Sequence, residues 1–273
     1  LEEYACLSHC WGGLQPIQTT RGNIESHKRG IDLAKLPLTF REAVLFTRRL
    51  GIRYLWIDSL CIIQDNILDW QEQSSNMCSV YGNSHLVLAA TKAANPMDGC
   101  FAKSQSEYVG WHSPSSAHDN FPLLQRAWVL QERYMAPRVL HFTQEELMWE
   151  CMAGQSCECT AGGVSNFPLL NIKTGAYHMT SADSSEMNML WRLLVKRYSS
   201  LDLSFESDRL AALSGLAKYY QSHGAGEYLA GVWKEHLREG DLAWTVRPHK
   251  SKRRSVQLAP TWSWASIEGS VSY

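Results

Sequence analysis

The chain has 273 residues, 45% of them hydrophobic, which is enough to bury the core of one large domain or two small ones. Its 26 basic and 27 acidic residues nearly cancel, which argues against a nucleic-acid partner held by a broad basic face. No apolar run approaches the length of a membrane span and no secretory signal is visible, so we expect no membrane partner and a cytoplasmic location.

The cysteines favour the same compartment and give no metal site. Several of the eight lie in apolar, strand-like contexts, as buried free thiols do. Three of them cluster in "CMAGQSCEC" (151–159). A zinc site usually needs paired Cys-x-x-Cys spacing and a fourth ligand, and this spacing differs. We therefore predict a loop here and no metal.

The first third of the chain alternates between strand and helix patterns. "YACLSHCWGG" (4–13), "IRYLWIDSLCII" (52–63) and "HLVLAAT" (85–91) are apolar, strand-like runs. Between them, 36–51 and 69–84 have the pattern of amphipathic helices. Nearly continuous apolar strands joined by helices predict an α/β fold with a mainly parallel sheet.

In a parallel sheet, ligands bind beyond the carboxyl ends of the strands. Ser8, His9, Trp11 and Gly12 follow the first strand, and Asp58 follows the second. We therefore take Ser8, Trp11 and Gly12 as candidate substrate-binding residues and His9 as a candidate acid or base. Asp58 could position a substrate hydroxyl, or it could cap the next helical turn.

The middle of the chain predicts a helix followed by a hairpin. After a polar loop at 92–124, "QRAWVLQERYMAPRVLHF" (125–142) begins as a helix, which Pro137 interrupts. A strand at 138–142 and a second at 147–151 would then pair antiparallel. In the helix, Trp128 and Glu132 are four residues apart and would share a face.

The pattern then changes. Residues 1–151 would form the α/β core, 152–184 a linker, and 185–273 a mainly helical extension that ends in a Trp-rich strand at 258–271. Within the extension, "GEYLAGVWKEHLREG" (226–240) has the pattern of a third helix.

Taken in order, these motifs resemble a known family. "YACLSHCWGG", "LPLTFREAV", "YLWIDSLCIIQD", "DWQEQSSNMCSVYGNSHLVLAAT" and "RAWVLQERYMAPRVLHF" resemble the heterokaryon-incompatibility (HET) domain of filamentous fungi. "FESDRLAALSGLA", "YLAGVWKEHL" and "APTWSWAS" resemble the region that commonly follows it. The resemblance implies a cytosolic protein of fungal self/non-self recognition that often triggers cell death.

More distantly, the motifs resemble Toll/interleukin-receptor (TIR) domains, which have a flavodoxin-like fold and some of which cleave NAD. "WVLQE" is similar to the TIR Trp-Cys-x-x-Glu element, with Val129 in place of the cysteine. The resemblance implies that Glu132 is the catalytic residue, with Trp128 beside the substrate. NAD would then be a substrate, and we expect no bound cofactor.

The chemistry of the residues is compatible with that role. Cleavage of the nicotinamide–ribose bond builds positive charge on the ribose, which a nearby carboxylate can stabilise. Arg126 could hold a phosphate. The alternative is structural: Trp128 belongs to the core, and Glu132 pairs with Arg126 or Arg133.

Three functions remain open at this stage. The domain could cleave NAD or a related nucleotide. It could instead be a small-molecule enzyme of fungal secondary metabolism that uses the same strand ends. It could also be a non-catalytic module that self-assembles into homo-oligomers during cell death.

Overall fold

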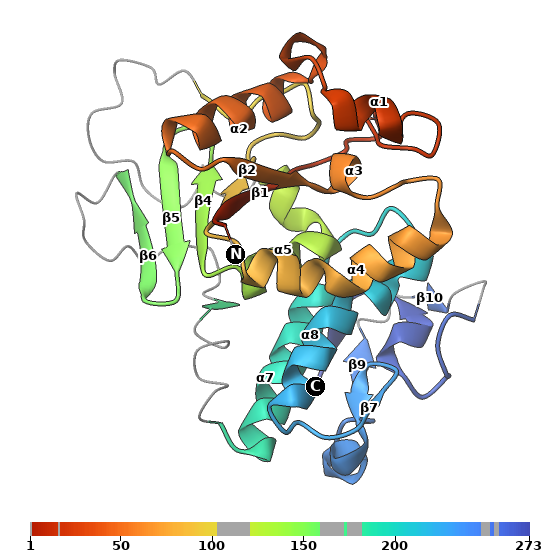
Figure 1. Cartoon of the computed structure of the whole chain (residues 1–273). Helices are drawn as coiled ribbons and strands as arrows, with labels where there is room; N and C mark the ends of the chain where they lie inside the picture. The colour runs from red at the N-terminus through yellow and green to blue at the C-terminus, as the bar shows by residue number, and fades with distance from the viewer. Residues whose placement is uncertain are drawn as a thin grey trace. The chain divides into compact units, whose positions relative to one another are not determined.

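The computed structural model describes residues 2–15, 17–102, 121–158, 172–173, 182–246, 252–253 and 257–273 (Figure 1). The chain forms two compact units, Leu1–Gln125 with Glu132–Lys173, and Arg126–Gln131 with Thr174–Tyr273. Helix α5 (Ala127–Met135) therefore begins in the second unit and ends in the first. No helix in these described ranges has both the length and the apolar character to span a bilayer.

The first unit contains a mixed sheet. Its described strands lie in the order β2-β1-β3-β4-β5-β6. They are β1 (Tyr4–Ser8), β2 (Tyr54–Ile57), β3 (Leu86–Ala89), β4 (Arg138–Phe142), β5 (Leu147–Cys151) and β6 (Gly154–Cys157). The first four pair in parallel, and β5 and β6 continue the sheet antiparallel. The α/β class and the antiparallel hairpin were predicted correctly. Strand β6 was not predicted, and it lies at the start of the expected linker.

Helices pack on both faces of this sheet, as Figure 1 shows for α2 and α4. Besides the end of α5, the described helical segments of the unit are α1 (Ile24–Arg29), η1 (Leu33–Lys35), α2 (Leu38–Arg49), α3 (Asp58–Cys61), α4 (Ile67–Gly82) and η2 (Pro122–Gln125). Leu7 of β1 and Ile57 of β2 point to the same side as Phe40 of α2 and form a core with it. Tyr4 and Cys6, which alternate with Leu7, point to the α4 side, where both donate to the carbonyl of Val80.

The second unit has two long helices and short β pairs. Its elements are α7 (Ser184–Tyr198), η4 (Glu206–Arg209), α8 (Ala211–Ser222), β7 (Tyr228–Leu229), β8 (Val232–Trp233), η5 (Lys234–Glu239), β9 (Thr245–Val246), β10 (Lys252–Arg253), η6 (Trp264–Ser266), β11 (Ile267–Glu268) and β12 (Val271–Ser272). Helix α7 begins with a reciprocal capping box between Asp183 and Glu186.

The helix expected at 226–240 is absent from the described structure. Its first half is instead the hairpin β7–β8, which turns through Ala230 (φ 43°) and Gly231 (φ 104°), and its second half is the 3-10 helix η5. The indoles of Trp191 and Trp264 both donate to the Gly231 carbonyl, at 2.9 and 2.8 Å. A Cβ on Gly231 would lie 2.5 Å from the Trp264 Nε1 atom. Tertiary packing on this turn thus overrides the helical pattern.

The strand expected at 258–271 is also different. The segment forms η6 and two-residue strands, and Trp264 and Ala265 are buried within the 3-10 turn. Ser263 is the N-cap of this turn, and its hydroxyl accepts from the Ala265 amide at 3.0 Å. Trp264 is therefore a core residue of a turn, while Trp262 is 41% exposed, and neither belongs to a period-two strand.

Candidate functional site

Glu132 lies at the carboxyl end of the first strand. Ser8 is the last residue of β1, and its hydroxyl donates to Glu132 Oε2 at 2.5 Å. Both residues are buried, with 2% and 6% of their surface exposed. Ser8 follows the alternation of Tyr4 and Cys6, so it points to the α4 side of the sheet. The carboxylate therefore points inward to the strand end that the sequence predicted as the ligand edge.

Tyr81 of α4 completes the buried part of this site. Its phenol is fully buried, and burial together with the negative charges of Glu132 and Asp58 raises its pKa well above the usual value. The Tyr81 hydroxyl therefore remains protonated at neutral pH.

Asp58 forms the exposed part of the site, with 22% of its side chain accessible. Its Oδ2 accepts from the Trp11 indole at 3.0 Å, and its Oδ1 accepts from the Ser59 amide at 2.6 Å. His9 Nδ1 lies 3.7 Å from the same Oδ1. Asp58 is the first residue of α3, whose N-cap is Ile57 without a side-chain cap hydrogen bond, so its carboxylate is not the cap that the alternative expected. It links the segments that follow β1 and β2.

Gly12 has a packing role. Its φ of +61° favours glycine, and a Cβ there would lie 2.4 Å from the Ala94 carbonyl oxygen. Gly13 has a similar φ of +70°, but a Cβ there would meet nothing within 4 Å. The loops after β1 and β3 approach each other so closely that Gly12 is required, whether or not a ligand binds there.

Arg133, one of the two arginines predicted to pair with Glu132, forms an ion pair with Glu150. Arg133 Nε and Nη2 donate to the two carboxylate oxygens of Glu150, at 2.6 and 2.9 Å. The backbone of Arg126 forms a parallel β-bridge with that of Asp202, and Trp128 Nε1 donates to Asp208 Oδ2 at 3.2 Å, both within the second unit. A substrate-binding role for Arg126 and Trp128 remains a prediction.

A second buried polar cluster was not predicted. Besides its ion pair with Arg133, Glu150 Oε2 lies 3.2 Å from His141 Nε2, and His141 Nδ1 lies 2.9 Å from Thr91 Oγ1. Burial raises the pKa of Glu150, but the charge of Arg133 and the hydrogen bonds from His141 and Arg133 outweigh it and hold the pKa well below its usual range. Lys173 donates to the Arg133 carbonyl at 2.7 Å, and burial lowers its pKa to about 8.

A sequence signal for this cluster existed. In the strand "LMWEC", Glu150 lies two residues after the apolar Met148, on the same face, and so occupies an inward position. A charged residue at such a position requires a buried partner. What the strand pattern does not show is which cation supplies it.

The cysteines give no metal centre in the described part of the chain, where no group of three or more potential ligands lies together. Among the described cysteines, six form no disulfide and Cys157 is disulfide-bonded. Cys61 is exposed, whereas Cys6, Cys10, Cys78 and Cys100 are buried.

Residues 4–132 match the model of the family described as heterokaryon incompatibility protein (HET). These residues therefore form a domain of the heterokaryon-incompatibility family. The HET domain thus includes the strand-end residues Ser8, His9 and Asp58 and ends at Glu132. No curated protein and no solved structure matches the chain.

Proposed function

We propose that this HET domain cleaves the bond between nicotinamide and ribose in NAD, with Glu132 as its catalytic carboxylate, during self/non-self recognition in the fungal cytoplasm. The observation that carries the proposal is the hydrogen bond from Ser8 to Glu132 at the end of β1. The similarity of "WVLQE" to the catalytic TIR element supports the same residue, and with it a distant TIR kinship.

The topology supports a ligand at this position. In the order β2-β1-β3-β4, the direction of the chain across the sheet reverses between β1 and β3. Open α/β sheets bind ligands at such switch points, outside the carboxyl ends of the strands. Ser8 ends β1, and Glu132 is hydrogen-bonded to it, so the carboxylate lies beside the switch point.

The residues supply what the reaction requires. When the C1′–N bond breaks, its electron pair moves to the nicotinamide nitrogen, which becomes neutral, and positive charge develops on the ribose. Glu132 would stabilise that charge, and water would then add to C1′ and lose a proton. Ser8 would hold the carboxylate in position. Asp58, which is partly exposed, would accept a hydrogen bond from a ribose hydroxyl.

The test is nicotinamide release from NAD, measured by chromatography with the wild type and with Glu132→Gln. Loss of a group that stabilises a transition-state charge lowers the rate about 100- to 1000-fold. Glu72→Gln, which removes an exposed carboxylate of α4, is the matched control and should retain full activity. A folded wild type that releases no nicotinamide even at high protein concentration would overturn the proposal.

The same samples separate the two alternatives. An oligomer detected by light scattering in a protein that releases no nicotinamide would favour the self-assembling module. A monomer that leaves NAD intact but turns over an organic metabolite, with a rate that depends on Asp58, His9 and Glu132, would favour the enzyme of secondary metabolism.

A further inference from the structure

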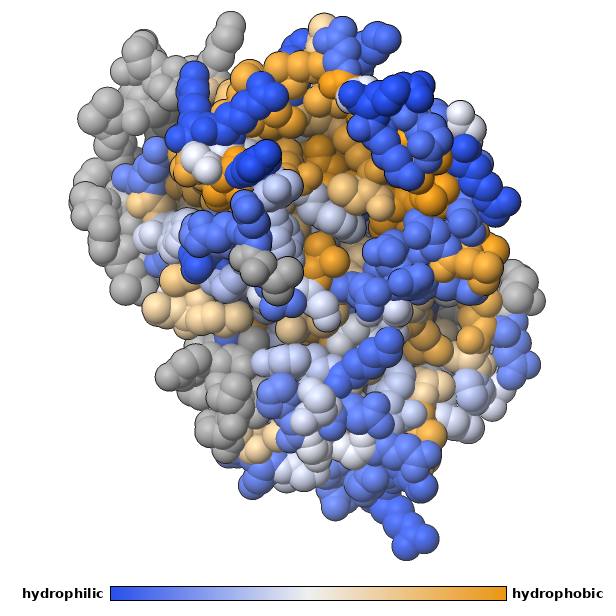
Figure 2. Space-filling model, viewed as in Figure 1, coloured by the Kyte–Doolittle hydropathy of each residue, from blue (hydrophilic) through white to orange (hydrophobic). Residues whose placement is uncertain are grey.

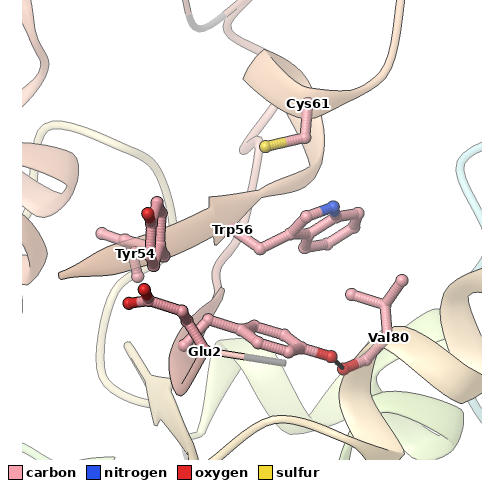
Figure 3. A pocket seen from close by; sticks show the side chains of 7 residues that line it. Glu2, Tyr54, Trp56, Cys61 and Val80 are labelled. Carbon is pink, nitrogen blue, oxygen red and sulfur yellow. Dashed lines mark hydrogen bonds between the residues drawn. The ribbon is translucent and has the colours of Figure 1, made fainter. Parts of the chain in front are cut away.

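A pocket of about 320 Å³ lies beside the edge strand β2, on the α4 side of the sheet. This is near the lower end of the roughly 300–1000 Å³ found for small-molecule sites. Three aromatic side chains line it, Tyr4 of β1 and Tyr54 and Trp56 of β2. In Figure 3 the side chains of Tyr54 and Trp56 border the opening together with Glu2. Figure 2 shows apolar residues gathered over the region of β2 and α3.

Each ring of this aromatic pocket is held in place by a contact with a neighbouring residue. The Tyr4 hydroxyl donates to the Val80 carbonyl at 2.6 Å. Trp56 packs edge-on against Tyr81, with 5.4 Å between ring centroids and an interplanar angle of 76°. Tyr54 is 46% exposed, and the guanidinium of Arg53 lies 5.7 Å from its ring centroid. A ligand would therefore meet rings that are already positioned, one of which attracts a cation in the structure.

The charge of the lining has one sign. Among the described residues that line the aromatic pocket, Glu2 alone carries a formal charge. Aromatic rings present negative faces, and a carboxylate at the edge adds to that potential. The combination of three rings and one acid favours a bulky, weakly hydrated cation over an anion or a neutral apolar group.

We propose that the aromatic pocket formed by Tyr4, Tyr54, Trp56 and Glu2 binds an alkylated ammonium group. Such a group could belong to a free quaternary amine or to a methylated lysine side chain, and both present the same methylated cation to the rings. The site is separate from the Ser8–Glu132 pair, so this proposal does not depend on NAD cleavage.

Titration calorimetry with choline tests the proposal, with its neutral isostere 3,3-dimethylbutan-1-ol as the matched ligand. Choline should bind, and the isostere, which has the same shape without the charge, should bind at least several-fold more weakly. A peptide with trimethyllysine, compared with the same peptide carrying unmodified lysine, distinguishes the source of the cation. Absence of binding by choline and by both peptides would overturn the proposal, as would equal binding of choline and the isostere.

Variants locate the binding in this pocket. Tyr54→Ala removes a partly exposed ring and should weaken choline binding about 2- to 30-fold, the range given by one cation–π contact. Glu2→Gln should weaken it up to about 5-fold, with a smaller effect at high salt. Glu3→Gln is the matched control, because Glu3 is also exposed but lies outside the lining and pairs with His85 at 3.3 Å. If Glu3→Gln weakened binding as much as Glu2→Gln, the assignment to this pocket would fail.

Discussion

Two carboxylates of the first unit are both buried but are held in different ways. Glu150 is fully buried between the bidentate guanidinium of Arg133 and the ring of His141. Glu132, next to Arg133 in the chain, turns to the strand end and accepts from the Ser8 hydroxyl at 2.5 Å. A cation matched to a carboxylate in a dry interior locks the chain into one arrangement. Glu132 is bonded instead to a neutral hydroxyl, and under the proposed function it is the carboxylate that a ligand would recruit.

The largest expected effect is the loss of stability when Glu150 is replaced. Glu150→Gln leaves the buried Arg133 without its counter-charge, and removing one partner of a buried ion pair costs about 3–5 kcal/mol. Urea unfolding should show this loss in the free energy of unfolding, while the exposed Glu72→Gln should stay within about 0.5 kcal/mol of wild type. A loss below about 1 kcal/mol would show that the Glu150 cluster does not anchor the fold.

The pH dependence of the free energy of unfolding tests the cluster around Glu150 further. Burial lowers the pKa of His141 below its ordinary 6.5. Between the native and unfolded pKa values, His141 is therefore protonated in the unfolded chain and neutral in the native protein. Stability is therefore complete above the unfolded pKa and falls as the pH drops below about 6.5, by up to about 1.4 kcal/mol per pH unit. The depressed pKa of Glu150 adds a further loss at lower pH, in the same direction.

Urea unfolding between pH 7.0 and pH 5.5 measures this slope. His141→Gln keeps hydrogen-bonding atoms near Glu150 but cannot take up the proton, so its slope should be smaller than that of wild type. Equal slopes would mean that His141 titrates as it does in the unfolded chain.

The smallest effect is expected at Glu132. In Glu132→Gln the amide oxygen can still accept from Ser8, so the free energy of unfolding should change by about 1 kcal/mol or less in either direction. The same variant should lose nicotinamide release, which separates a catalytic effect from a loss of folding. If Glu132→Gln destabilised the protein as much as Glu150→Gln, Glu132 would be a structural anchor and the contrast between the two carboxylates would disappear.

The parts of the fold that the sequence predicts are those in which neighbouring residues form a recognisable pattern. The apolar runs at 4–13, 52–63 and 85–91 contain β1, β2 and β3, because a strand covered on both faces needs apolar residues nearly throughout. Pro137 marks the end of α5, and the apolar run after it is β4. Asp58 and the residues after β1 could be placed at the ligand edge because strand polarity determines which ends meet.

Local patterns failed where distant residues decide. Thr39 and Glu42 have the spacing of a capping box, yet Pro37 occupies the N-cap of α2. Thr39 Oγ1 instead accepts from the Gly99 amide at 3.1 Å, and Glu42 Oε2 accepts from the Cys100 amide at 2.6 Å. Both side chains thus hold a segment some 60 residues away, whose position the helical pattern cannot reveal.

The candidate site divides in the same way. The sequence by itself determined the alternation of strands and helices, the ends at which Ser8, His9 and Asp58 lie, and the presence of a carboxylate on the helix before β4. Only the tertiary structure decided that Ser8 donates a hydrogen bond to Glu132 while Arg133 forms an ion pair with Glu150. Neighbours on a helix point in directions about 100° apart, and the partner of each buried charge is supplied by whichever distant strand packs against that direction.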